Sequence, residues 1–205
     1  MGAAPDIRTQ KATLRATMRA ALSAVSADDA RVWSGEIASL LFGRLASTRR
    51  VMLYWPINAG VRDVAMAEPD LRALVSSLLG AGVEVSLPRT DWGNGTISAR
   101  IVREPHTELA AGRFGLSEPL PTCAVITRAP DAVVVPGMAF DAEGWRLGRG
   151  KGLYDGFLRS LRAERPCVSR VIGVCFGMQV VDRVPHGEHD QRLDEVWTER
   201  GRLGV

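Results

Sequence analysis

Short, continuously hydrophobic segments alternate along the chain with segments in which hydrophobic residues recur every three or four positions. The recurring pattern is typical of amphipathic helices, because that spacing places the residues on one helix face. It predicts helices over 11–25, 26–45, 69–79 and 152–162. The continuous pattern is typical of strands that are buried on both faces. It predicts strands over 51–55, 83–87, 96–102, 131–137, 171–176 and 195–198.

Strands that are apolar throughout and alternate with helices predict an α/β fold. We expect a mostly parallel central sheet with helices on both faces, a three-layer, Rossmann-like arrangement. In such sheets ligands bind beyond the carboxyl ends of the strands. The loops of greatest interest are therefore 136–152 and 177–190, which follow two of the predicted strands.

Residues with special backbone preferences set the expected ends of these elements. Ser26 followed by Asp29 predicts the N-terminal cap of the second helix. Pro88 is expected to end the strand before it, because proline has no backbone N–H to donate. Residues 89–96 are rich in turn formers and 103–121 have no hydrophobic repeat, so a turn and a loop are expected there.

The composition narrows the class of protein. A chain of 205 residues that is 46% hydrophobic and 24% charged suits one domain over residues 1–205. Its net charge of +3 is spread along the chain, which argues against a nucleic-acid partner. No apolar run reaches the roughly 20 residues of a membrane span, and no signal core opens the chain. We expect a cytoplasmic monomer that uses neither membrane nor nucleic acid.

Lysine is rare in this chain. Of its 26 basic residues only Lys11 and Lys151 are lysines, and the others are arginines. One interpretation is chance under a coding bias toward arginine. The other is that these lysines stand where a compact, mobile ammonium is needed in place of a planar guanidinium.

The segment from Arg146 to Asp155, RLGRGKGLYD, carries the strongest chemical signal. Its glycines allow backbone N–H groups to approach an anion, and the helix predicted to follow adds a partial positive charge. Its bases add full charges, so the segment predicts a phosphate cradle; the alternative is a flexible basic loop. Asp155 is either a magnesium ligand beside that cradle or a residue that stabilises the start of the helix.

Four motifs in the same order resemble the 5-formyltetrahydrofolate cyclo-ligases, also called methenyltetrahydrofolate synthetases. The longest lies within 131–158 and reads V-P-G-M-A-F-D followed by G-x-R-L-G-x-G-x-G-x-Y-D. The others are K-x-x-L-R from Lys11, G-L-S-E-P from Gly115 and a closing segment over 179–199. The resemblance therefore extends over nearly the whole chain.

This resemblance implies an enzyme that uses ATP and Mg²⁺ to close 5-formyltetrahydrofolate to 5,10-methenyltetrahydrofolate, releasing ADP and phosphate. It assigns catalysis to Arg146, Arg149 and Lys151. It assigns the nucleotide to Lys11, Arg15, Arg146, Leu147, Gly148, Arg149, Gly150, Lys151, Gly152, Leu153 and Tyr154. It assigns the folate to Trp55, Gly60, Arg149, Gly150, Lys151, Gly152 and Leu153. It assigns magnesium to Asp155 and Asp190.

Two positions depart from the family pattern. Gly60 stands where a glutamate usually contacts the pterin, and the nearest carboxylate is Asp63. Leu153 stands where the family commonly has a tyrosine. Two alternatives therefore stay open: a related enzyme that binds ATP but acts on another substrate, and a nucleotide-binding module without catalysis.

Overall fold

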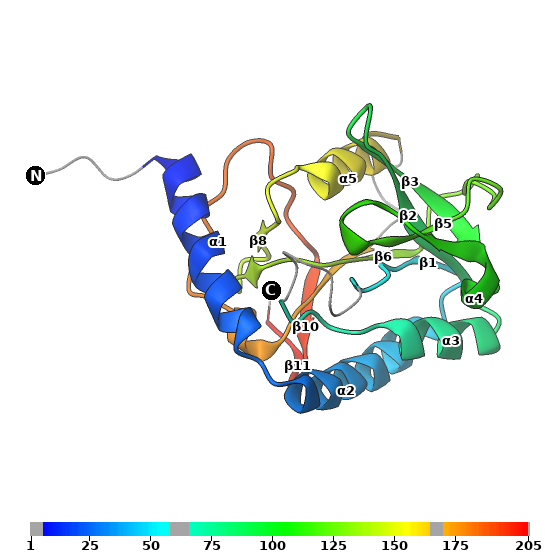
Figure 1. The fold of residues 1–205 in the computed structure, drawn as a ribbon, viewed down its shortest axis with the longest axis horizontal. Helices are drawn as coiled ribbons and strands as arrows, with labels where there is room; N and C mark the ends of the chain where they lie inside the picture. The colour runs from blue at the N-terminus through cyan, green and yellow to red at the C-terminus, as the bar shows by residue number, and fades with distance from the viewer. Residues whose placement is uncertain (1–5, 58–65, 165–169, 205) are drawn as a thin grey trace, which may run out of the picture.

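The central sheet is mostly parallel, as predicted. The computed structural model describes residues 6–57, 66–164 and 170–204, and within them the main sheet has seven strands (Figure 1). In spatial order these are β11 (Gly201–Arg202), β10 (Glu195–Thr198), β9 (Arg170–Val174), β6 (Ala132–Val135), β1 (Arg50–Met52), β2 (Glu84–Asp91) and β3 (Thr96–Val102). The five inner strands run parallel, and β3 and β11 pair antiparallel at the two edges.

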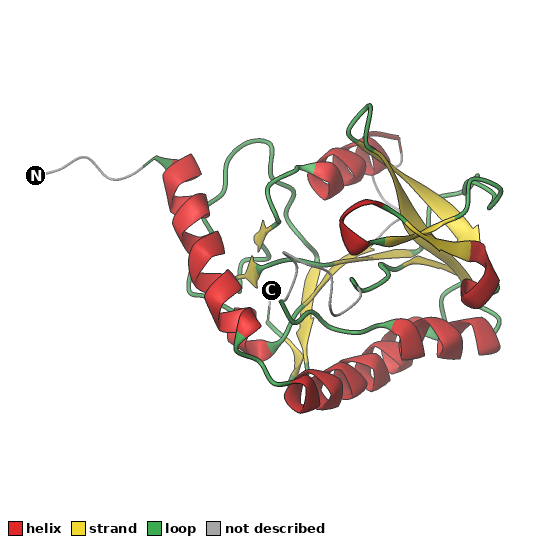
Figure 2. Cartoon of the chain, in the orientation of Figure 1, coloured by secondary structure: helices red, strands yellow, loops and turns green. Residues whose placement is uncertain are grey.

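Helices cover both faces of this sheet, which confirms the expected layers (Figures 1 and 2). On one face lie α2 (Ala27–Leu45) and α3 (Arg72–Gly80), and on the other lies α5 (Leu153–Glu164). Helix α1 (Ile7–Ser23) stands at one end, against the small hairpin of β7 (Ala139–Phe140) and β8 (Arg146–Leu147). Among the described helices, none has both the length and the hydrophobicity that crossing a membrane requires.

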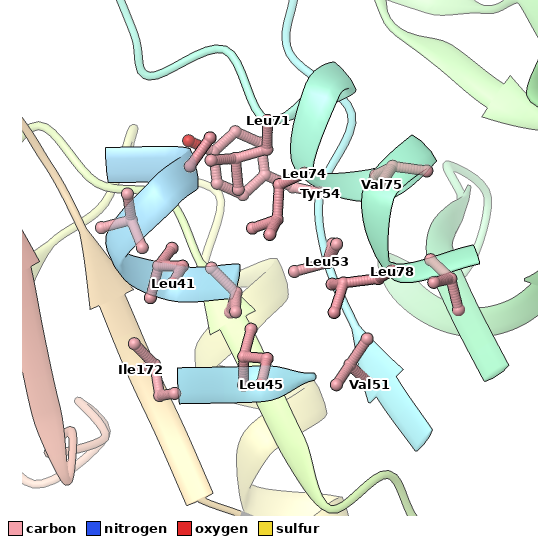
Figure 3. Packing of buried hydrophobic residues seen from close by; sticks show 14 of the residues in the cluster. Leu41, Leu45, Val51, Leu53, Tyr54, Leu71, Leu74, Val75, Leu78 and Ile172 are labelled. Carbon is pink, nitrogen blue, oxygen red and sulfur yellow. The ribbon is translucent and has the colours of Figure 1, made fainter. Parts of the chain in front are cut away.

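The two-sided cover explains why the inner strands are apolar throughout. Along β1, Val51 packs into the cluster beneath α2 and α3, whereas Met52 packs into the cluster beneath α5. Successive residues of a strand point to opposite faces, so both faces demand hydrophobic side chains. Figure 3 shows the first cluster, in which leucines of α2 and α3 meet Val51, Leu53 and Ile172.

The predicted helix cap at Ser26 is confirmed. The Ser26 hydroxyl accepts a hydrogen bond from the Asp29 backbone N–H at 3.0 Å, which satisfies one unpaired donor at the start of α2. The predicted start of the third helix at Pro69 was early, since α3 begins at Arg72.

The expected strand end at Pro88 was wrong. Strand β2 runs on to Asp91, pairs with β3 from Val85 to Asp91, and leaves only residues 92–95 for the turn. The pairing of β1 with β2 ends at Ser86, so at Pro88 the strand is paired only on the side of β3. Proline is tolerated at such edge-like positions of a strand.

The segment expected to be a loop over 103–121 also contains regular structure. It holds a short helix, α4 (Pro105–Glu108), and a small two-stranded sheet of β4 (Leu109–Ala111) and β5 (Ser117–Pro119). Between these strands lies a 3₁₀ turn, η1 (Arg113–Gly115). The segment brings the G-L-S-E-P motif beside the β2–β3 hairpin.

Candidate active site

A cavity of about 460 Å³ lies beyond the carboxyl ends of the inner strands. Tyr54 and Trp55, which follow β1, line it together with Pro136 and Gly137, which follow β6. This is where ligands bind in open α/β sheets, because the loops that follow parallel strands meet at one edge. All the described residues with predicted site roles line this cavity: Lys11, Arg15, Trp55, Arg146, Leu147, Gly148, Arg149, Gly150, Lys151, Gly152, Leu153, Tyr154, Asp155 and Asp190. The predicted contact at Gly60, and with it Asp63, lies outside the described residues.

The cavity has two chemically different sides. The glycine-rich segment and α1 contribute the cations Lys11, Arg15, Arg149 and Lys151. The aromatic and aliphatic residues of the other side are Trp55, Pro88, Trp92, Ile97, Phe114 and Leu116. A polyanion is favoured on the basic side and a flat aromatic ligand on the apolar side.

The glycine-rich segment leads directly into the N-terminus of α5. Gly150 and Gly152 have φ of +102° and +68°, a left-handed backbone that glycine adopts without strain. Helix α5 starts at the next residue, Leu153. On the other side, the Arg15 Nε donates to the Gly148 carbonyl at 2.9 Å and ties α1 to the segment. Backbone N–H groups, a helix terminus and several cationic side chains thus meet in one place, as an anion site requires.

Lys11 and Asp190, which both line the cavity, form an ion pair. The Lys11 ammonium lies 2.6 and 2.5 Å from the two carboxylate oxygens of Asp190, and both side chains are 17% exposed. The Gly187 N–H also donates to this carboxylate, at 2.7 Å. Burial raises the pKa of Asp190, but the bonds from Lys11 and Gly187 outweigh burial and hold the pKa below its usual value.

Arg146 is buried beneath the glycine-rich segment. Its side chain is 3% exposed, and its Nη2 donates to Asp155 Oδ1 at 3.0 Å. Its Nη1 donates to the Pro136 carbonyl at 3.2 Å, and its guanidinium lies 5.7 Å from the centre of the Tyr154 ring. These contacts fix the guanidinium in place, so its clearest effect is to orient Asp155 toward the cavity.

Glu68 is a cavity residue that the sequence interpretation missed. Its Oε2 lies 3.2 Å from Arg149 Nη2, and its Oε1 accepts the Ile57 N–H at 2.6 Å. Burial raises the pKa of this carboxyl, although Arg149 opposes the rise. The available signal was a second carboxylate after the first strand, in the stretch Glu68-Pro69-Asp70 just before a predicted helix.

Two segments that are distant in the sequence contribute residues to the apolar side of the cavity. Trp92 at the tip of the β2–β3 hairpin meets Phe114 of η1 with ring centroids 5.1 Å apart in a T-shaped contact. Glu118 of the G-L-S-E-P motif is buried, and its carboxylate accepts the Thr90 N–H at 3.0 Å. The motif therefore positions the aromatic wall, a role that its sequence did not reveal.

Comparison with known proteins identifies the family. Residues 7–199 match the family model described as the 5-formyltetrahydrofolate cyclo-ligase family. The chain belongs to this family. A 5-formyltetrahydrofolate cyclo-ligase of Mycolicibacterium smegmatis is 33% identical over 174 residues, which span 82% of this chain and 84% of the relative. The mouse cyclo-ligase is 25% identical over 203 residues, 95% of this chain and 96% of the relative.

Solved structures agree with that assignment. The 5,10-methenyltetrahydrofolate synthetase of Aquifex aeolicus is 30% identical, with a TM-score of 0.77 over 94% of this chain and 91% of that one. The synthetase of Mycoplasma pneumoniae is 19% identical with a TM-score of 0.66, and it supports the fold alone.

The carboxylates of this cyclo-ligase family member suit a magnesium ion that arrives with a nucleotide. Asp155 and Asp190 both line the cavity. Within the described ranges, no group of three or more histidine, cysteine, aspartate or glutamate residues could hold a metal by itself. Magnesium in nucleotide sites is bound by one or two carboxylates together with phosphate oxygens, so the donor set fits this ion.

Proposed function

We propose that this chain cyclises 5-formyltetrahydrofolate to 5,10-methenyltetrahydrofolate, consuming ATP and releasing ADP and phosphate. The observation that carries the proposal is the divided cavity of a cyclo-ligase family member: a glycine-rich, basic side adjoins an aromatic side. Such a cavity holds a triphosphate next to a flat, fused-ring substrate. That juxtaposition is what phosphorylation of the folate by ATP requires.

The reaction needs positioning and charge neutralisation more than covalent help from the protein. The formyl oxygen attacks the γ-phosphorus, and ADP leaves. N10 then attacks the activated carbon and loses its proton to solvent, and phosphate leaves as the ring closes. Lys151 and Arg149 neutralise the charge that develops on the transferred phosphoryl group, and the glycine-rich backbone holds it in line. Arg146 acts by orienting Asp155.

The folate binds on the aromatic side, with Trp55 packed against it. Glu68 supplies the carboxylate that the sequence interpretation found missing at Gly60. It supports this assignment that Glu68 lines the cavity and lies beside Arg149 of the glycine-rich segment. A carboxylate accepts hydrogen bonds from the N–H groups of a pterin ring.

Asp155 and Asp190 hold the magnesium of the nucleotide. When bound there, the ion would supply Lewis-acid chemistry that neutralises part of the charge on the phosphates. We further propose that residues 1–205 act as one domain in a cytoplasmic monomer without a nucleic-acid partner. Size-exclusion chromatography with light scattering tests the monomer directly.

The decisive experiment follows the methenyl product by its absorbance, with purified protein, 5-formyltetrahydrofolate and Mg-ATP. Product formation that requires all three supports the proposal. ATP turnover that only another substrate stimulates would favour the related enzyme. Nucleotide binding without any turnover would favour the non-catalytic module.

A further inference from the structure

The two carboxylates assigned to magnesium differ in whether their oxygens are already occupied by hydrogen-bond donors. Arg146 and the Gln191 N–H both donate to Oδ1 of Asp155, at 3.0 and 3.3 Å. In the described part of the chain, Oδ2 of Asp155 has no hydrogen-bond donor. Both oxygens of Asp190, in contrast, are engaged by Lys11. Within the described structure, Asp155 therefore keeps one oxygen open to a metal ion, whereas the Lys11 ammonium occupies Asp190.

The two cations paired with these carboxylates differ in how firmly the protein holds them. The Arg146 guanidinium is buried, and the Pro136 carbonyl holds it in addition to Asp155. Lys11 projects from α1 on a flexible stem, and Asp190 is the acceptor found for its ammonium among the described residues. A lysine in that position can exchange one anionic partner for another, whereas Arg146 cannot leave without stranding a buried charge.

A nucleotide bound in the cavity would give Lys11 a second anionic partner. Lys11 lines it together with the glycine-rich segment and Lys151. A triphosphate bound there would bring oxygens with more total charge than one carboxylate carries. Transfer of Lys11 to the phosphate would free both oxygens of Asp190 for the cation that accompanies the nucleotide.

We infer that Lys11 closes the metal site of the empty protein, and that Asp190 accepts magnesium only after a nucleotide phosphate has drawn Lys11 away. Lys11 is thereby a positioning residue that sets the order of binding. The inference rests on the proposed ATP and magnesium site. Its consequence is that metal affinity is low without nucleotide and high with it.

Isothermal titration calorimetry of the full chain with Mn²⁺ tests this order. Mn²⁺ is a suitable probe because it prefers the same carboxylate and phosphate oxygens as Mg²⁺. We expect the parent protein to bind Mn²⁺ at least about tenfold more tightly when saturated with β,γ-methylene-ATP than when empty. The nucleotide analogue alone, titrated with Mn²⁺, provides the baseline to subtract. Equal affinity in the two states overturns the inference.

Lys11→Gln gives the sharper result, a gain of binding. Removing the ammonium frees Asp190, so the empty variant should bind Mn²⁺ at least about tenfold more tightly than the empty parent. Arg15→Gln is the matched control: it removes a cation from the same cavity one turn along α1, but Arg15 donates to a carbonyl and leaves the Lys11–Asp190 pair intact. The empty Arg15→Gln variant should gain much less affinity for Mn²⁺ than the empty Lys11→Gln variant.

The double variant Lys11→Gln/Asp190→Asn should lose the gain, which locates the bound ion at Asp190. No gain in folded Lys11→Gln, or an equal gain in Arg15→Gln, overturns the inference. These titrations need no folate and no turnover. A failed product assay would therefore count against the proposed function, and a failed titration against the role of Lys11.

Discussion

At the scale of single residues, cations that look alike in the sequence have different surroundings in the cavity. Arg146, Arg149 and Lys151 lie within six positions of one another. The Arg146 side chain is buried against Asp155, Arg149 lies beside Glu68, and Lys151 is exposed at the cavity. Lys151 has no ion-pair partner in the described part of the chain, so it is the cation most free to meet a phosphate.

Lys151→Gln should therefore reduce turnover strongly and leave the fold unchanged. Losing a charge that strengthens its contact in the transition state costs about 3 kcal/mol, or roughly a hundredfold in kcat. Steady-state measurement of methenyl product checks this. Arg128→Gln, an exposed residue that does not line the cavity, loses the same charge and should keep parental activity. Near-parental turnover of the Lys151 variant would contradict the assignment of this segment to phosphate binding.

Glu68→Gln should weaken folate binding more than it slows turnover. The lost charge-assisted hydrogen bond is worth roughly 1.5–3 kcal/mol, about ten- to a hundredfold in KM for the folate. Glu36→Gln, an exposed change on α2, serves as the control. An unchanged folate KM in the Glu68 variant would exclude this carboxylate from pterin recognition.

The pH dependence gives a second measurement on the same residue. Burial raises the pKa of Glu68 above 4.5, so the native carboxyl takes up a proton at a higher pH than an ordinary glutamate. Folate KM in the parent should rise as the pH falls through that raised pKa. The Glu68→Gln variant should lack this rise.

At the scale of elements, close packing decides which glycines are essential. A Cβ on Gly173 in β9 would lie 2.6 Å from Leu193 and from the Phe140 ring, whereas a Cβ on Gly43 in α2 would meet no atom within 4 Å. Phe140 is fully buried and cannot move away easily. The strand accepts only glycine at this point because β7 packs directly over it.

Gly173→Ala should destabilise the protein by about 1–3 kcal/mol, the usual cost of overpacking a filled core. Gly43→Ala should stabilise it by about 0.5–1 kcal/mol, because alanine loses less backbone entropy inside a helix. Urea denaturation of both variants and the parent measures the two effects. Equal stability of the two variants would contradict this account of the packing.

At the scale of the whole molecule, one buried carboxylate ties the sheet to its helical cover. Glu195 of β10 is 1% exposed and lies 2.9 Å from Arg44 of α2 and 3.3 Å from Arg170 of β9. The indole N–H of Trp197 also donates to it, at 2.8 Å. Burial raises the pKa of Glu195, but the bonds from Arg44 and Trp197 outweigh burial and lower the pKa below 4.5.

Glu195→Gln should lower the free energy of unfolding at pH 7 by about 2 kcal/mol, since hydrogen bonds to a charged group are lost. A lowered native pKa means that the stabilisation is complete above about pH 4.5 and fades as the pH falls through the native pKa. The gap between parent and variant should therefore narrow on acidification. Urea titrations at neutral and acidic pH check this, and a gap that widens toward low pH would contradict it.

The sequence by itself determined the layered α/β fold, the glycine-rich basic segment before the last helix and the family. Each of these rests on local information: hydrophobic spacing selects helices and buried strands, and glycines, bases and the start of a helix lie together within 146–155. Where local rules misled, as at Pro88, the missing information was which strand lies alongside and where its pairing ends.

Only the tertiary structure decided which charges meet. Lys11 and Asp190 are 179 positions apart and still form an ion pair, and Glu68 reaches Arg149 across 81 positions. Side-chain charge and spacing carry no information about such partners, because the sheet topology brings the loops together. For the same reason Arg146 is identifiable as a buried support for Asp155, and Trp92 and Phe114 as one aromatic wall, only in the folded chain.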